Sequence, residues 1–131
     1  DGDTALMLAA EEGHTATVTA LLAVPGIDVH AADGDGDTAL MVAAGGGHTA
    51  VVTALLAMPG IDVNATDGQA STALIRAALG GHTETVRALL AAPGLDVNAA
   101  DVNDNTALAI AEGYGHFETA SLLYGAPMYG R

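Results

Sequence analysis

The sequence predicts an all-α solenoid, in which helix-turn-helix units stack side by side and project hairpin loops. Three motifs recur with one period of 34 residues. Thr-Ala-Leu begins at four positions: Thr4, Thr38, Thr72 and Thr106. Gly-His recurs four times in the same register, and Pro-Gly-(Ile/Leu)-Asp-Val recurs three times. Because three independent motifs keep one register, the 131-residue chain is an array of one supersecondary unit.

Residues 33–66 show how one unit begins. The stretch at 33–37, Asp-Gly-Asp-Gly-Asp, has the composition of a turn, and Thr38 is a good helix N-cap. The apolar residues at 39–44 then predict a short helix, which the three glycines at 45–47 end. Each unit is therefore expected to open with a tight turn and a short, buried helix.

A second helix is predicted from about 48 to 57, with apolar side chains along one face: Val51, Val52, Leu55 and Leu56. Pro59-Gly60 ends this helix, and residues 61–64 lead as an extended arm into the next turn. Helices of about nine residues are too short to be stable alone in water. Their stability must come from stacking on neighbouring units.

The four units are expected at about 1–32, 33–66, 67–100 and 101–124, in a single domain with a C-terminal tail at 125–131. Glu112 stands where the earlier units have Ala10, Ala44 and Ala78. Another unit stacked on Glu112 would bury a carboxylate, so unit four is expected to be a C-terminal cap. Unit one has no such polar replacement. We expect its outer face either to be the cut edge of a longer array or to pack on another molecule.

The chain resembles the ankyrin repeat family from residue 1 to about 124. In the second unit the resemblance rests on three runs of family motif residues: Asp33-Gly36-Thr38-Leu40-Ala43-Ala44-Gly47-His48, then Val52-Leu55-Leu56, then Gly60-Asp62-Val63-Asn64-Ala65. The family's Thr-Pro-Leu-His becomes Thr-Ala-Leu followed by an apolar residue: Met7, Met41, Ile75 or Ala109. We expect apolar packing to replace the histidine hydrogen bonds that the family forms there.

The resemblance implies a non-catalytic scaffold that binds a protein partner on a concave face, built from hairpin tips and the ends of the first helices. It also implies an intracellular, cytoplasmic location and makes the first Asp of each turn structural: Asp33, Asp67 and Asp101. Carried onto this sequence, the partner-binding positions are Asp3, Glu11, Glu12, Asp35, Asp37, Gln69, Ser71, Leu79, Val102, Asn103, Asn105 and Tyr114.

These positions change in character along the chain. Units one and two contribute mainly carboxylates, whereas units three and four contribute Leu79, Val102 and Tyr114, which can anchor an interface. We hypothesise that a basic segment binds the N-terminal half and that an apolar side chain binds near Tyr114. In the alternative interpretation, the acidic turns are merely solvated and Tyr114 covers the cap.

The net charge is −13, with three Arg and no Lys. This charge argues against nucleic acid or an anionic membrane as a partner, because phosphate binding needs Lys and Arg. It favours a basic protein partner, although acidity can also reflect solubility or source composition. No apolar run is long enough for a membrane span, and no signal peptide is recognised. The absence of Cys excludes disulfides and thiol chemistry.

No motif for catalysis or for a cofactor is recognised, so the chain is not expected to be an enzyme. The four Gly-His histidines would lie about 8–10 Å apart in stacked helices, too far to share a metal, and are expected to be structural. A weak calcium candidate remains at Asp33, Asp35 and Asp37, which resemble the start of an EF-hand loop but lack its Gly and Glu. Two alternatives to a protein-binding scaffold therefore remain: a weak calcium-binding protein, and a fragment that self-associates through its N-terminal face. Unless it self-associates, the protein is expected to be a monomer.

Overall fold

The structure is a computed structural model and describes residues 4–125. Within that range the chain forms four helical pairs and no β-strand, only an isolated antiparallel bridge between Ala100 and Thr106. The helices are α1 (Ala5–Glu11), α2 (Thr15–Leu22), α3 (Ala39–Gly45), α4 (Thr49–Leu56), α5 (Ala73–Leu79), α6 (Thr83–Leu90), α7 (Ala107–Gly113) and α8 (Phe117–Tyr124). The all-α fold class predicted from the 34-residue period is confirmed.

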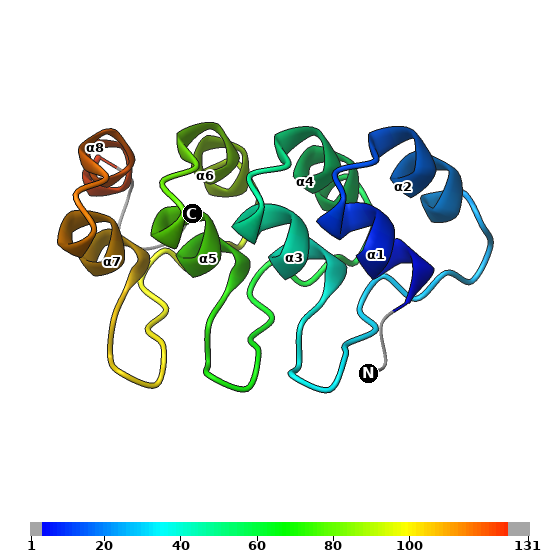
Figure 1. Ribbon diagram of the computed structural model, residues 1–131, viewed down its shortest axis with the longest axis horizontal. Coiled ribbons are helices and arrows are strands. Elements are labelled where there is room, and N and C mark those ends of the chain that lie inside the picture. Colours follow the sequence, from blue (N-terminus) through cyan, green and yellow to red (C-terminus); the bar gives the residue numbers. More distant parts are fainter. Residues whose placement is uncertain (1–3, 126–131) are drawn as a thin grey trace.

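The helices form two parallel rows (Figure 1). The first helices of the units, α1, α3, α5 and α7, lie side by side in one row, and the second helices, α2, α4, α6 and α8, lie in the other. The loops that connect successive units project on the side of the first helices, away from the second row (Figure 1). The first helices therefore lie between the second helices and the projecting loops.

Each first helix begins at the predicted threonine cap. The Thr4 hydroxyl accepts a hydrogen bond from the backbone N–H of Met7 at 3.1 Å, and its three counterparts make the same contact with Met41, Ile75 and Ala109. This contact satisfies one of the backbone donors that a helix start leaves open. In unit two the second helix, predicted at about 48–57, covers Thr49–Leu56, because His48 and Ala57 are its caps. The first helix, predicted at 39–44, extends one residue further, to Gly45.

The core is built from small side chains between the two rows. Ala10, Ala44 and Ala78 are fully buried, so neighbouring first helices can approach closely. At the position where apolar packing was expected to replace histidine, Met7, Met41 and Ile75 are buried. In unit four the same position is Ala109, which is exposed, so the replacement holds for the first three units only.

Histidines connect each unit to the one before it. The His48 ring lies directly over Gly13, and its Nε2–H donates to the carbonyl of Glu11 at 3.0 Å. His82 and His116 donate in the same way to Gly45 and Leu79. The structural role predicted for the Gly-His histidines is therefore confirmed for these three residues.

Polar side chains of the second helices and loops add two further links between units. The hydroxyls of Thr49 and Thr85 are 2.8 Å apart, and Thr83 and Thr119 repeat this contact one unit later. In the loops, Asn64 accepts from the N–H of Asp96 and donates to the carbonyl of Gly94. His30, at the position of Asn64 in unit one, accepts from the N–H of Asp62 at 2.9 Å and so makes an equivalent link.

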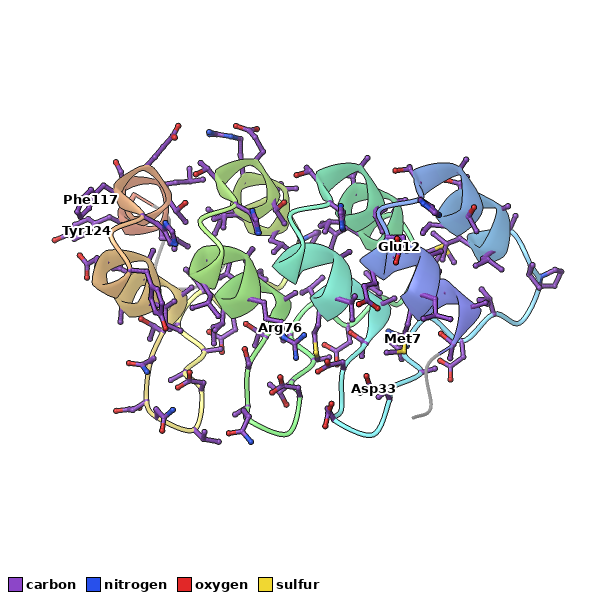
Figure 2. All side chains as sticks on the ribbon, viewed as in Figure 1. Met7, Glu12, Asp33, Arg76, Phe117 and Tyr124 are labelled. Carbon is purple, nitrogen blue, oxygen red and sulfur yellow. The ribbon has the colours of Figure 1, made fainter. Side chains whose placement is uncertain are left out.

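The outer face of unit four differs from the faces between units. Glu112 is exposed, whereas its counterparts Ala10, Ala44 and Ala78 are buried. Phe117 and Tyr124 are 75% and 73% exposed, and Figure 2 shows both projecting at the α8 end of the array. A further unit stacked here would bury the Glu112 carboxylate, and the cap-like character of unit four stays a prediction.

Candidate partner-binding surface

Each projecting loop is held by its first aspartate. Asp33 Oδ1 accepts hydrogen bonds from the backbone N–H groups of Asp35 and Asp37, at 2.9 and 3.0 Å. Asp67 and Asp101 make the same pair of contacts in the next two loops. Their predicted structural role is therefore confirmed: a short carboxylate side chain replaces the backbone partners that a tight turn lacks.

Neighbouring loops are also bonded to one another. The N–H of Gly68 donates to the carbonyl of Asp35, and the N–H of Val102 donates to the carbonyl of Gln69, both at 3.0 Å. The tips of the three described loops, 33–37, 67–71 and 101–105, are thus connected in a row. We call the surface between these loops and the first helices the loop-side groove.

The N-terminal part of the loop-side groove contains an acidic hollow of about 450 Å³. It extends from α1 to Arg76 on α5 and is lined by Met7, Glu11, Asp33, Asp37, Val42, Gly45, Gly46 and Arg76. Figure 2 shows Met7 and Asp33 on the loop side of the first helices. The lining thus combines three carboxylates with two apolar side chains, Met7 and Val42. A long basic side chain could place its aliphatic stem against the apolar residues and its charged head near the carboxylates.

The C-terminal part contains a second hollow, of about 590 Å³, between α5 and α7. Its apolar wall consists of Ile75, Leu79, Ile110 and Tyr114, of which Tyr114 is 65% exposed. Its rim carries the neutral polar side chains Gln69, Ser71, Asn103 and Asn105, next to Asp67, Asp101 and Arg76. We call the two hollows the acidic hollow and the apolar hollow.

Arg76 borders both hollows and is the one cationic side chain among the residues that line them. Its Nη2 forms ion pairs with Asp37 of the preceding loop and with Asp67 at the base of its own loop. Figure 2 labels Arg76 on α5. Burial alone would lower the pKa of Arg76, but the two carboxylates raise it. Burial alone would likewise raise the pKa of Asp67, but hydrogen bonds from Arg76 and from the Ser71 and Gln69 N–H groups lower it.

Sequence reasoning did not select Arg76 as a site residue. The signal was available, because the equivalent positions in the other units are Leu8, Val42 and Ile110, all apolar. A cation at a repeat position that is otherwise apolar needs a carboxylate partner nearby. One of its partners, Asp67, belongs to the same unit, but Asp37 could not be identified from the sequence, because it lies 39 residues away in the preceding unit.

Nine of the twelve predicted partner-binding residues line one of three hollows. The acidic hollow contains Glu11 and Asp37, and the apolar hollow contains Gln69, Ser71, Leu79, Asn103, Asn105 and Tyr114. Asp35 lines a third hollow between the loop tips, together with Asp33, Asp67 and Arg76. Glu12 and Val102 are exposed but line none of these hollows, and Asp3 lies outside the described residues.

In the candidate calcium site, some of the carboxylate oxygens already bind backbone N–H groups or Arg76. Carboxylate oxygens of Asp33, Asp35 and Asp37 lie within 4.8 Å of one another, the one cluster of this kind found in the described part of the chain. Asp33 Oδ1 already accepts two backbone N–H groups, and Asp37 is paired with Arg76. Only Asp35 is both exposed and outside an ion pair, so the cluster offers few uncommitted ligands.

None of the helices in residues 4–125 has the length and apolar character needed to cross a membrane.

A protein-family model described as ankyrin repeats (3 copies) matches residues 1–67 and 61–129. A search of the curated proteins found no match. Ankyrin repeats are generally protein–protein interaction modules and are typically non-catalytic. The matched ranges cover almost the whole chain and coincide with the stacked helical pairs described above. The chain therefore belongs to the ankyrin repeat family.

Proposed function

We propose that this protein is a non-catalytic interaction module that binds a basic segment of a protein partner in its loop-side groove. The observation that carries the proposal is the pairing of two different hollows in one groove. The acidic hollow offers three carboxylates, one from α1 and two from the loop 33–37, and the apolar hollow offers an exposed Tyr114 together with Leu79. A basic side chain in the first and an apolar side chain in the second would complement both.

The acidic hollow is suited to a cation although Asp37 is already paired. Glu11 is exposed at the end of α1, and the acidic hollow extends to the base of a loop whose tip carries the exposed Asp35. The chain's net charge of −13 adds a long-range attraction that speeds the approach of a basic partner. An intracellular location, implied by the family resemblance, and the absence of catalysis are part of the same proposal.

The experiment compares capture of basic partners by groove and control variants. Glu11→Lys/Asp35→Lys reverses two exposed charges of the groove and leaves the Asp37–Arg76 ion pair intact. Glu84→Lys/Glu118→Lys changes the net charge equally, but on the second helices α6 and α8. Each immobilised variant is incubated with the same lysate, and bound proteins are quantified by mass spectrometry.

The proposal expects a set of basic proteins that the unchanged protein and the α6/α8 variant retain and that the groove variant loses. Equal retention by the two variants would show that net charge, not the groove, governs capture. Retention by all three forms would show that neither the groove carboxylates nor the net charge matters. Either result contradicts the proposal.

Self-association is a second candidate, favoured by one specific observation. Thr85 and Thr119 are buried and receive contacts from the preceding unit, whereas their counterpart Thr17 is exposed on α2. Light scattering from micromolar to millimolar concentration tests this candidate: a constant monomer mass contradicts it, and a mass that falls back to monomer in Thr17→Lys supports it.

A further inference from the structure

The chemistry of the loop-side groove changes in a fixed order along the units. The acidic hollow begins between α1 and α3, and the apolar hollow lies between α5 and α7. Arg76 on α5 is a wall residue of both. A ligand that follows the groove therefore meets carboxylates first, then a cation, then an apolar wall.

Arg76 retains donors that its ion pairs do not use. Both ion pairs engage the same nitrogen, Nη2, while Nε and Nη1 take part in neither. A guanidinium group carries five N–H donors and no acceptor. A ligand atom over Arg76 should therefore be an acceptor, either a backbone carbonyl or a carboxylate, and a second cation there would be repelled.

The stacking of the units fixes the distance between the hollows. Neighbouring packed helices lie about 8–10 Å apart, so the carboxylates at the α1–α3 end of the acidic hollow and the apolar wall between α5 and α7 are two such steps apart, or about 18 Å. An extended chain advances about 3.3 Å per residue, so this distance corresponds to about five or six residues. A folded partner surface has no such fixed separation between residues along its sequence.

We propose that the groove recognises an extended linear segment with a basic side chain in the acidic hollow, a hydrogen-bond acceptor over Arg76, and an apolar side chain five or six residues from the basic one in the apolar hollow. This inference rests on the proposed function, because it specifies the ligand of the same groove. The rim of the apolar hollow is consistent with it. Gln69, Asn103 and Asn105 carry neutral amides that can donate to and accept from an extended backbone.

The experiment selects ligands from a displayed library of random dodecapeptides, with the full chain as the target. Enriched peptides are sequenced, and pairs of basic and apolar residues are counted at every separation relative to the unselected library. The strongest binders are then measured by fluorescence anisotropy against two half-site variants. Glu11→Lys/Asp35→Lys alters the acidic side, with Glu84→Lys/Glu118→Lys as its control. Tyr114→Ser alters the apolar hollow, with Tyr124→Ser, an exposed tyrosine on α8 outside both hollows, as its control.

The proposal expects enrichment of basic–apolar pairs at separations of five and six. Each half-site variant should bind the selected peptides at least about tenfold more weakly, the loss expected for a buried anchor, while both controls bind normally. If the half-site variants weaken binding of the selected peptides but those peptides show a different basic–apolar separation, or no preferred separation, the linear motif is overturned. That result does not contradict the proposed function. Peptides that bind all variants equally, or a selection that enriches nothing, count against both.

Discussion

Arg76 connects two loops through side chains that are only partly exposed, so its replacement should destabilise the fold. Arg76→Met keeps the aliphatic stem and removes both ion pairs, leaving Asp37 and Asp67 without their cation. Hydrogen bonds to charged groups contribute about 1.5–3 kcal/mol when buried, and partial exposure reduces this, so we expect a loss of about 1–2 kcal/mol. Urea unfolding at pH 7 measures it. Arg87→Met is the control, because its exposed ion pair with Glu84 should contribute almost nothing.

The effect of Arg76 should depend on pH in a defined direction. The pKa of Asp67 is lower in the folded protein than in the unfolded chain, so folding favours its ionised form. The resulting stability is present above the ordinary aspartate pKa, about 4, and is lost as pH falls through the folded value. The difference in unfolding free energy between the unchanged protein and Arg76→Met should therefore shrink between pH 5 and pH 2.5. A difference that stays constant over this range would assign the effect to packing of the stem.

Ala70 has a positive φ, a backbone conformation that suits glycine better than alanine. Ala70 has φ +59° at the tip of loop 67–71, and the equivalent residue of the preceding loop is Gly36, with φ +82°. The left-handed region costs a residue with a Cβ about 1–2 kcal/mol, partly offset by the entropy that glycine loses on folding. We expect Ala70→Gly to stabilise the protein by about 0.5–1 kcal/mol in thermal unfolding. Gly36→Ala should have the opposite sign, and a lower Tm for Ala70→Gly would refute the strain argument.

At the scale of the helical elements, the contact between successive units depends on glycine lying beneath histidine. A Cβ on Gly47 would lie 2.6 Å from His82 Nδ1, and φ there is +71°. Gly115 occupies the same repeat position with φ +75°, but its Cβ would meet nothing closer than 4.0 Å. Gly115→Ala should therefore cost only the backbone strain, about 1–2 kcal/mol, and Gly47→Ala about 1–3 kcal/mol more through displacement of His82. Urea unfolding of the two variants gives this difference. Equal losses would mean that the histidine contact adds no stability.

The elements themselves could be predicted from the sequence because their signals are local. Thr38 is followed by an apolar run that three glycines end, and the structure contains a capped helix there, Ala39–Gly45, which extends one residue beyond the predicted 39–44. The contact of His48 with Gly13 could be predicted only as a structural role. Its geometry depends on how two units stack, and the Gly-His motif does not contain that relation. Local chemistry therefore determines the helix, and the arrangement of neighbouring units determines the contact.

At the scale of the whole molecule, a difference in residue type between two units becomes a difference in chemistry between two positions along the groove. The acidic-to-apolar change could be read from the sequence, because equivalent residues of successive units lie in a row along the groove. The two hollows could not be predicted, since their walls combine residues of three units, as Met7, Val42 and Arg76 do in the acidic hollow. Arg76 was overlooked for the same reason, because one of its two partners, Asp37, belongs to a different unit.

The net charge of −13 should make the stability of the whole array depend on salt. Most carboxylates are unpaired by any cation, since the chain has three Arg and no Lys, so repulsion between like charges opposes folding. Salt shortens the range of this repulsion from about 30 Å at 0.01 M to about 8 Å at 0.15 M. We expect Tm to rise by about 3–8 °C over this range, the shift that 1–2 kcal/mol produces in a domain of this size.

Calorimetry at matched pH in sodium chloride measures the shift, and Glu84→Lys/Glu118→Lys supplies the control. Each replacement changes the charge by two, so the variant carries −9 and should start from a higher Tm with a smaller response to salt. The Arg76 ion pairs act in the opposite direction, because salt weakens attraction as well as repulsion. They are few and partly buried, whereas the repelling carboxylates are many and mostly exposed, so repulsion should dominate. A Tm that falls as salt is added would reverse this ranking and make the ion pairs, not the net charge, the main electrostatic contribution to stability.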